Sequence, residues 1–374
     1  MAGVFSRRVL LSWGIVLVLG ILMLCTGCTA PGTTNTTPGD PQSGMNGTAI
    51  GTGSAANSSP AIPVSNVTVT PTPPTRYEPL SVKAVPKKTD EERTFSFRYA
   101  SQDFSVTLPV NMTLYRAAND SANQKAVVAD GDLSHFYSAM IDDPAMDEFF
   151  NETGRRLEKM KYRKGNQMTE DDFLELLVSF VQQIRTDDAK RMPRYPVQVI
   201  ADRSGTVAEK SILLAGLLAF HGYDSAVLIF PEKDNVAAGL HIQVQTKPSF
   251  RVFSDGRRDY IYIETGTTRL VGMYPDGYKT IKDPVIVRTG NGTMMYRKMD
   301  SIGNIMYDLA TMKTSIGTIK EKQQSGQAME WDEEALSSYE ETIRFVESTN
   351  DRIRAIEAVR ESELPHHSSC MTCV

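Results

Sequence analysis

Residues 205–222 read GTVAEKSILLAGLLAFHG, and this stretch decides the expected fold. Apolar residues cover most sides of the helix that it predicts, and a helix without a polar face is buried in a core. The predicted helix runs from Thr206 to His221, and Gly222 is placed as its C-terminal stop. A helix of this kind must be surrounded by other elements, so we expect it at the centre of its domain.

The segments around this helix predict an α+β fold. Period-two alternation of apolar and polar residues indicates strands, and spacing of three and four indicates helices. The expected elements are strands at 95–99 and 104–108 with a turn at 100–103, helices at 132–163 and 169–189, an extended segment at 194–200, the central helix, and strands at 225–230, 239–246 and 259–264. Helices followed by successive strands predict a central helix packed on an antiparallel sheet.

Two further helical patterns follow, so we expect additional C-terminal helices. Apolar residues share one face in each of them: Ile305, Leu309, Met312 and Ile316 in the first, and Leu336, Tyr339, Ile343, Val346, Asn350 and Ile353 in the second. The second set is a heptad-like seam with a polar residue in it. The seam is compatible with docking against the same chain and with a dimeric coiled coil. Trp331 is expected to anchor the second helix.

The N-terminus has the composition of a targeting segment. Arg7 and Arg8 precede an apolar run over residues 9–24, and Gly27-Cys28 follows. A basic start and a short apolar core are typical of a signal peptide, and the Gly27-Cys28 step resembles a lipoprotein cleavage site at which Cys28 carries the lipid. Lipidation, an uncleaved anchor and release are the three alternatives. The first two place the bulk of the chain at the cell surface, tethered to a membrane.

Residues 29–75 differ in composition from the rest of the chain. Thr, Pro, Gly, Ser, Asn and Ala dominate them, and Asp40 carries the only charge. Such a segment buries too little apolar surface to offset the entropy of ordering, so we expect a disordered linker. Asn-x-Ser/Thr sequons are glycosylation candidates, here and further on: Asn35, Asn46, Asn57, Asn66, Asn111, Asn119, Asn151 and Asn291.

Composition and boundaries complete the outline. The chain has 374 residues and a net charge of −5. It has no basic surplus for binding phosphates, so nucleic-acid binding is not expected, and no cofactor is predicted. The four cysteines lie only at the ends. The predicted parts are a targeting segment or anchor (1–28), a linker (29–75), a folded domain (76–300), a helical extension (301–364) and a tail (365–374).

Several segments occur in an order that resembles the transglutaminase-like, papain-type superfamily, in the branch found in archaeal and bacterial surface proteins. They are Phe180-Val181-Gln182 with Ile184, Arg194-Tyr195-Pro196, Gly205 to Leu218, Gly222-Tyr223-Asp224, and Tyr260-x-Tyr262-x-Glu264-Thr265. The resemblance covers about residues 92–280. It implies a papain-like core in which the central helix carries the catalytic nucleophile.

In that family a cysteine starts the central helix, where the helix dipole and a histidine favour the thiolate that attacks an acyl carbon. This chain has Val207 at the cysteine position and Asn235 at the histidine position. Glu264 matches the acidic residue that orients the histidine. Because valine has no nucleophilic atom, the resemblance implies a degenerate site without catalysis.

Other hydroxyls near the helix start are candidate replacements for the cysteine. Ser204, Thr206 and Ser211 lie there, and His241 follows on a strand. Ser204 and Thr206 are expected to cap the helix, because hydroxyl residues commonly do so at this position. A single histidine on a strand is more often structural than catalytic.

Three more polar residues on this helix have structural interpretations. Glu209 and Lys210 are expected to form a surface salt bridge. His221 is expected to contact carbonyl groups at the helix C-terminus.

The tail has the ligand types of a zinc site in His366, His367, Cys370 and Cys373. The loop between them is very short, so a local disulfide or a disordered end is expected instead of a metal site.

Two functions follow from these observations. The first is a membrane-tethered extracellular module that binds an envelope protein, an extended peptide or a glycan without catalysis. The second is a hydrolase or acyl transferase with a relocated nucleophile, which needs a nucleophilic side chain within hydrogen-bond reach of a base. Val207 and Asn235 favour the first.

Overall fold

The central helix α6 (Val207–Phe220) is buried over most of its length. Thr206 starts it with a capping box: its Oγ1 accepts a hydrogen bond from the Glu209 N–H at 3.2 Å, and Glu209 Oε2 accepts one from the Thr206 N–H at 2.9 Å. The helix stops before Gly222, whose φ of +80° suits glycine. The expected central helix is present with its predicted cap.

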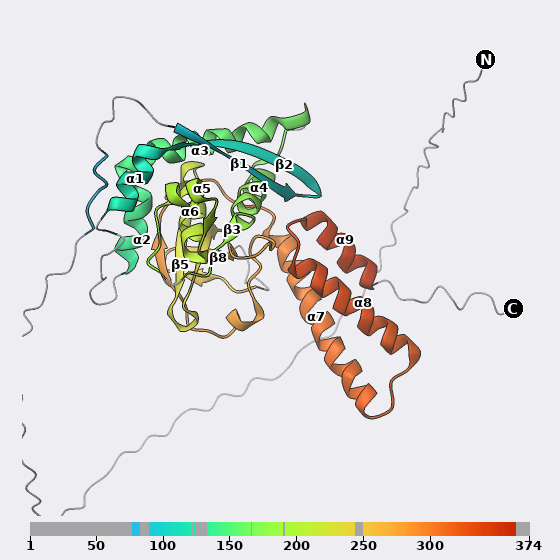
Figure 1. Ribbon diagram of the computed structural model, residues 1–374. Coiled ribbons are helices and arrows are strands. Elements are labelled where there is room, and N and C mark those ends of the chain that lie inside the picture. The colour runs from blue at the N-terminus through green and yellow to red at the C-terminus, as the bar shows by residue number, and fades with distance from the viewer. Residues whose placement is uncertain are drawn as a thin grey trace, which may run out of the picture. The chain divides into compact units, whose positions relative to one another are not determined.

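The computed structural model describes residues 77–82, 90–121, 123, 133–165, 167–189, 191–243 and 250–363 (Figure 1). All of them belong to one compact unit, Val69–Val374. The targeting segment with Cys28, the linker with its four sequons, and the tail with His366, His367, Cys370 and Cys373 lie outside the described residues. In the described part of the chain no helix has both the length and the apolar character needed to cross a membrane.

A five-stranded antiparallel sheet packs against α6. Its strand order is β7-β8-β6-β5-β9, built from β5 (Ser225–Phe230), β6 (Asn235–Ile242), β7 (Phe253–Ser254), β8 (Asp259–Ile263) and β9 (Val285–Arg288). The strands next to α6 are β5 and β6. Helices and an antiparallel sheet in separate parts of the chain make this an α+β fold, as predicted.

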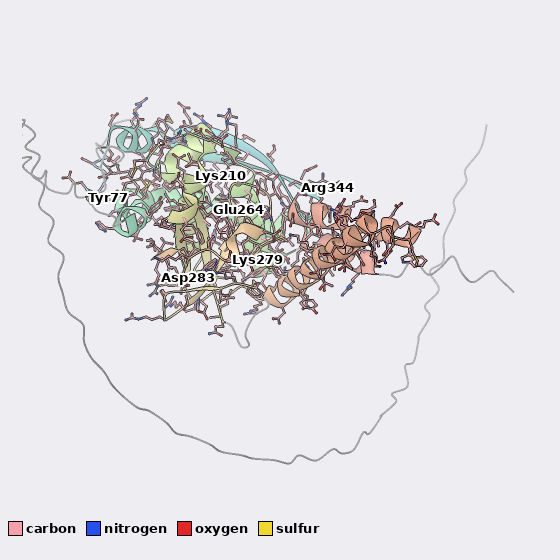
Figure 2. The ribbon with its side chains drawn as sticks, turned by 90° about the horizontal axis from the view of Figure 1, so that it is seen from below. Tyr77, Lys210, Glu264, Lys279, Asp283 and Arg344 are labelled. Carbon is pink, nitrogen blue, oxygen red and sulfur yellow. The ribbon has the colours of Figure 1, made fainter. Side chains whose placement is uncertain are left out.

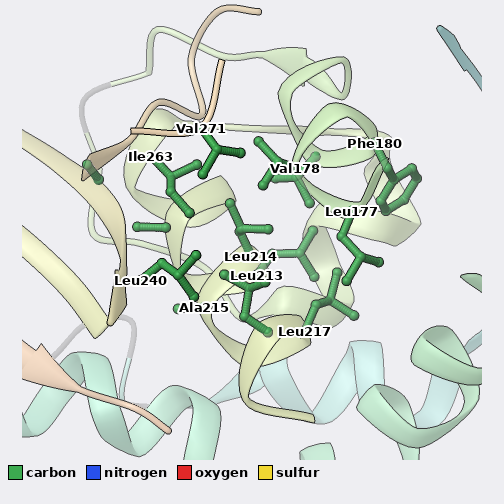
Figure 3. Close-up of a cluster of buried hydrophobic side chains, with 14 of the residues drawn as sticks. Leu177, Val178, Phe180, Leu213, Leu214, Ala215, Leu217, Leu240, Ile263 and Val271 are labelled. Carbon is green, nitrogen blue, oxygen red and sulfur yellow. The ribbon is translucent and has the colours of Figure 1, made fainter. Parts of the chain in front are cut away.

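The core lies between α6, the sheet and α4. Figure 3 shows Leu213, Leu214 and Leu217 of α6 among side chains from α4, β6 and β8. Each of these three leucines is fully buried. An all-round apolar helix has no solvent-facing side, so its position at the centre follows from its sequence.

Strand β6 begins earlier than predicted. It starts at Asn235, which pairs with Phe230, and it ends at Ile242 rather than at residue 246. The turn η5 (Pro231–Lys233) and Asp234, with φ of +47°, reverse the chain so that it pairs with β5 from Asn235 onward. The predicted start at residue 239 was therefore wrong.

Strands β1 (Asp90–Tyr99) and β2 (Gln102–Asn111) form a separate hairpin. Ala100 and Ser101, with φ of 46° and 62°, make its two-residue turn. Its apolar face packs on α4 (Glu170–Gln182). At the outer edge of β1, Gln183 holds Arg98: its Nε2 donates to the Arg98 carbonyl at 2.7 Å, and its Oε1 accepts from the Arg98 N–H at 2.9 Å.

Helix α4 is shorter than predicted. Thr169 caps it by accepting a hydrogen bond from the Asp172 N–H at 3.1 Å, as expected. It ends at Gln182 instead of residue 189, because β3 (Arg185–Thr186) leaves to pair in parallel with β4 (Ser204–Gly205). Ser204 therefore lies in a strand and does not cap α6, contrary to the prediction.

The predicted extended segment at 194–200 is wrong. It contains a helix, α5 (Pro196–Asp202). Proline is compatible with the first helical position, where its missing N–H has no intrahelical partner to lose. The Gln198 Oε1 accepts a hydrogen bond from the Tyr195 N–H at 3.1 Å and helps to start the helix.

The predicted helical region at 132–163 holds two helices, α2 (Leu133–Asp142) and α3 (Asp147–Glu158). Asp143 separates them, because its Oδ1 accepts from the Ala145 N–H at 2.9 Å and starts the short turn η3 (Pro144–Met146). A second short turn, η4 (Lys159–Gly165), follows α3. Helix α1 (Met112–Asp120) and the turn η6 (Asp276–Tyr278) were not predicted.

The C-terminal region forms three helices, α7 (Met299–Gln324), α8 (Glu330–Glu347) and α9 (Arg352–Glu363), rather than two. They contact one another, as docking within one chain requires. Asn350 lies between α8 and α9, so the predicted heptad seam is interrupted there. Its Nδ2 donates to the Arg98 carbonyl at 2.7 Å and lies 3.0 Å from Ser179 Oγ. Trp331 is 60% exposed, so it does not anchor α8.

Glu175 of α4 joins the hairpin to the C-terminal helices. The Tyr99 hydroxyl donates to its Oε2 at 2.8 Å, and Oε1 accepts from the Tyr296 hydroxyl at 2.6 Å and from Arg352 Nε at 3.1 Å. Burial first and the Glu175 charge second raise the pKa of both tyrosines, which keeps their hydroxyls as donors. One buried carboxylate thus connects β1, the chain before α7, and α9.

We predict that Glu175→Ala lowers the free energy of unfolding by about 3–5 kcal/mol, because it leaves the Arg352 charge and two buried hydroxyls without their acceptor. Glu340→Ala is the matched control: Glu340 pairs with Lys320 at 2.9 Å on an exposed surface, and its loss should cost less than about 1 kcal/mol. Urea unfolding of the two variants measures the difference. Equal midpoints would contradict the role of Glu175.

Candidate functional site

The residues matched to the catalytic positions gather at the start of α6. Thr265, which follows β8, places its Oγ1 3.1 Å from the Val207 carbonyl oxygen. The next residue, Gly266, is so close to Val207 that a Cβ added to the glycine would lie 3.0 Å from Val207 Cγ2. The Gly266 N–H donates to Glu264 Oε1 at 2.7 Å. Val207 and Glu264 therefore border the same small region.

Asn235 reaches this region through two tyrosines. Its Nδ2 donates to the Tyr278 hydroxyl at 2.5 Å, and the Tyr262 hydroxyl donates to Glu264 Oε2 at 2.8 Å. The rings of Tyr262 and Tyr278 are 5.4 Å apart between centroids. Two hydrogen bonds and one ring contact thus link the end of β8 to the start of β6.

The carboxylate of Glu264 accepts hydrogen bonds from its neighbours on both oxygens. Besides Tyr262 and the Gly266 N–H, it accepts a hydrogen bond from the Thr265 N–H at 3.0 Å. Burial first, and then the Glu264 charge, raise the pKa of Tyr262 far above its ordinary value, so this hydroxyl stays a donor. Glu264 holds a loop and a tyrosine in place, and it contacts no histidine in the described part of the chain.

Ser211 is one turn after Val207 and is fully buried. Its Oγ lies 2.8 Å from the Val207 carbonyl oxygen, 3.1 Å from the Val236 carbonyl oxygen and 2.8 Å from Thr265 Oγ1. Two of these partners are backbone oxygens and the third is a hydroxyl, and none of them is a general base. The hydroxyl links α6 to β6 and to the end of β8.

Lys210 is fully buried, which corrects the predicted surface salt bridge with Glu209. Its Nζ donates to the carbonyls of Gln182 and Ile184 at 2.9 and 2.8 Å, and to Thr186 Oγ1 at 3.1 Å. These carbonyls lie at and just beyond the end of α4, where helix carbonyls lack intrahelical partners. Burial lowers the pKa of Lys210 to about 8, although the charge of Glu264 acts in the opposite direction. Figure 2 labels Lys210 and Glu264, which are both buried.

Glu209 pairs with arginines instead of Lys210. It is fully buried and accepts hydrogen bonds from Arg191 Nε at 3.1 Å and Arg194 Nε at 3.0 Å. Burial alone would raise the pKa of Glu209, but the hydrogen bonds from Arg194, the Thr206 N–H and Arg191 outweigh it and hold that pKa below its ordinary value. Glu209 is therefore an ionised part of the scaffold.

In the described part of the chain, the contacts of His135, His221 and His241 do not include Val207, Asn235 or Glu264. His221 packs edge-on between Phe173 and Phe220, and its Nε2 has no hydrogen-bond partner among the described residues. The predicted contact with helix carbonyls is therefore wrong for this atom. Burial lowers the pKa of His221 to about 4. His241 Nδ1 lies 3.0 Å from the Asp259 carbonyl oxygen, within the β6–β8 pair.

Four predicted glycosylation sites fall on described residues, and they differ in accessibility. Asn111 caps α1 by accepting hydrogen bonds from the Thr113 and Leu114 N–H groups at 3.0 and 3.2 Å. Asn151 is half-buried in α3, and the threonine of its sequon is buried. Asn119 and Asn291 are exposed. Among the described residues, no group of three or more His, Cys, Asp or Glu side chains could hold a metal ion.

Sequence reasoning missed Tyr278, Arg191 and the buried position of Lys210. Arg191 and Tyr278 lie in stretches without periodicity, so no pattern pointed to them. A lysine one turn into a helix is exposed by default, and only the approach of the α4 end reveals its partners.

No protein-family model, curated protein or solved structure matches the chain.

We predict a pH-dependent stability from Lys210. Its pKa is about 8 in the folded protein against an ordinary 10.5, so the unfolded state binds this proton more tightly. Below about pH 8 both states are protonated and the penalty is complete. Between about pH 8 and 10.5 the unfolded state holds more protons, so the contribution of Lys210 to the free energy of unfolding rises with pH.

The measurement compares urea unfolding of the wild type and Lys210→Met from pH 7 to pH 10.5. From pH 7 to pH 10.5, the free energy of unfolding of the wild type minus that of the variant should increase by at most about 3 kcal/mol. Other titrating groups are common to both proteins and cancel in the difference. A difference that stays constant over the window would show that Lys210 keeps its ordinary pKa.

Proposed function

We propose that this chain is a membrane-tethered extracellular protein whose transglutaminase-like domain is degenerate and acts by binding, without catalysis. The observation that carries the proposal is the start of α6. An apolar side chain, Val207, stands at the expected nucleophile position. The polar groups of Ser211, Thr265 and Glu264 around it are hydrogen-bonded to one another, to backbone or to the Tyr262 hydroxyl. A cysteine mechanism needs a thiolate at this place, and Asn235 cannot exchange a proton as imidazole does.

The papain-like core is part of the same proposal. Its support is the ordered series of segments in the sequence, together with a central helix packed on an antiparallel sheet and the meeting of Val207, Glu264 and the Asn235 network at one end of that helix. The tether and the cell-surface location rest on residues 1–28 and on the composition of the linker. The partner class, an envelope protein, a peptide or a glycan, follows from that location.

The alternative is a hydrolase or acyl transferase with a relocated nucleophile. Ser211 would be the candidate, because it is the hydroxyl nearest to Val207 on the buried face of α6. Its contacts do not favour this role, because the Oγ is fully buried and has no base among its partners. The binding function therefore has the stronger support.

We predict that the purified full chain shows no transglutaminase or peptidase turnover. Removing members of a catalytic unit of this kind costs roughly 10⁶-fold in rate, so residual turnover should be undetectable. The assay is run with and without iodoacetamide, and again after deletion of residues 365–374, which removes Cys370 and Cys373. Turnover that iodoacetamide abolishes and that survives the deletion would overturn the proposal, and turnover that is lost in Ser211→Ala would establish the alternative.

The double variant Val207→Cys/Asn235→His is the positive control for the position of the site. If the matched positions have the geometry of a thiol–imidazole pair, iodoacetamide should alkylate Cys at 207 below the ordinary thiol pKa of about 8.5. The matched control is Ala208→Cys in the wild-type background, which feels the same helix dipole but lacks the imidazole. Equal alkylation profiles for the two variants would contradict the assigned positions without bearing on the absence of turnover.

A further inference from the structure

The turn between α7 and α8 displays two large apolar side chains. Met329 is 52% exposed and Trp331 is 60% exposed. We call residues 326–334 the arm tip. Trp331 is the only tryptophan in the described part of the chain, and the other one in the sequence is Trp13. Tryptophan and methionine are enriched in protein interfaces, so their exposure at one turn indicates a contact surface.

Two partly buried polar contacts of Asp332 fix the start of α8 at the arm tip. Asp332 is buried, its Oδ2 accepts from the Met329 N–H at 3.0 Å, and its Oδ1 accepts from Lys322 Nζ at 2.9 Å. The two apolar side chains are therefore presented from a fixed helix start. A preorganised surface loses less entropy on binding than a flexible one.

The arm tip is also acidic. Residues 330–334 read EWDEE, which is four acidic residues out of five. Asp332 is used internally, whereas Glu330, Glu333 and Glu334 are exposed. No ion pair of these three occurs within the described residues. Acidic side chains are repelled by anionic lipid headgroups, so a membrane surface is a poor partner for this tip.

A surface of opposite character lies at the end of α3. Residues 155–162 read RRLEKMKY, with four basic residues and one acidic residue. Two of the four are paired within the chain: Arg156 with Glu152, and the buried Lys161 with Glu170. Arg155 and Lys159 are exposed, and Tyr162 is 60% exposed. Phe220 is 38% exposed and lies so close to Gly154 that a Cβ there would clash with its ring. We call this surface, formed by residues 155–162 and Phe220, the basic patch.

We propose that the arm tip of one copy docks on the basic patch of a second copy of this chain. The two surfaces are complementary, because each presents two exposed apolar side chains and the exposed charges beside them have opposite signs. The charges are Glu330, Glu333 and Glu334 on the tip, and Arg155 and Lys159 on the patch. In Figure 1 the end of α3 and the α7–α8 turn lie well apart, so the tip and the patch of one copy do not contact each other. The occupant is a second copy because the chain itself carries the complementary surface.

Such a contact joins two different surfaces, so it is heterologous and propagates from copy to copy. Heterologous contacts close into rings or continue as open arrays. Each added copy presents a free tip and a free patch to the next one. This self-association is independent of the degenerate site at α6, because it uses neither Val207 nor its neighbours.

The experiment reverses each surface and then mixes the variants. The tip variant is Glu330→Lys/Glu334→Lys, and the patch variant is Arg155→Glu/Lys159→Glu. Each changes two exposed residues that are four apart in the sequence: both tip residues lie in α8, whereas Arg155 lies in α3 and Lys159 directly follows it. The matched control, Glu357→Lys/Glu361→Lys, makes the same charge change as the tip variant on exposed positions of α9. Sedimentation velocity of the full chain in detergent measures association, and thermal melting verifies that every variant is folded.

The wild type and the α9 control should associate in a concentration-dependent way. Each surface variant alone should associate roughly tenfold more weakly or not at all, because like charges then face each other. A mixture of the two variants should associate again, since each reversed surface meets an oppositely charged partner. In a Trp13→Phe background, association should also shift the emission of Trp331 to shorter wavelength.

A monomeric wild type would overturn the proposal. So would wild-type association that persists in both surface variants, because it would then arise elsewhere, for example through the N-terminal segments in the micelle. If both variants are monomeric and their mixture stays monomeric, the two surfaces do not pair with each other and the proposal fails. None of these results changes the expected absence of turnover.

Discussion

The buried carboxylate of Glu209 determines how the start of α6 is built. It accepts hydrogen bonds from Arg191, from Arg194 and from the Thr206 N–H, while the Thr206 hydroxyl caps the helix in return. A fully buried charge is tolerated only when partners surround it, and removing such partners costs several kcal/mol. The two arginines must therefore approach α6, which places the chain before α5 beside it. Lys210, the next residue, holds the end of α4 by its carbonyls.

This construction has a consequence for chemistry. In a thiol enzyme the first turn of such a helix carries a thiolate that is paired with an imidazole and can be reached by the substrate. Here the polar groups around Val207 already have partners within the domain. Ser211 and Thr265 bond to each other and to backbone, and Glu264 holds Tyr262 and the following loop. The region is arranged as a junction between α6, β6 and β8.

Much of the central architecture could be predicted because local and tertiary signals agree there. The apolar sides of α6, its Thr206 cap and the stop at Gly222 are local features, and β5 reads as a buried strand. The failures have physical causes. Pro196 is compatible with both an extended chain and a first helical turn, so α5 was missed. The length of α4 depends on the pairing of β3 with β4, which are remote in sequence. Asn350 reads as a helix position until its contacts with Arg98 and Ser179 are seen.

The most direct test of a closed junction at the start of α6 is amide hydrogen exchange, followed by mass spectrometry, on the wild-type chain. The backbone amides of residues 204–211 and 263–267 should exchange as slowly as those of the buried strand β5, because exchange there requires large-scale opening of the core. The α7–α8 turn provides the fast reference within the same molecule. Slow exchange at the junction is the result that the account predicts. Exchange there as fast as in that turn would mean that the region opens locally to solvent, as a working substrate site would, and would contradict it.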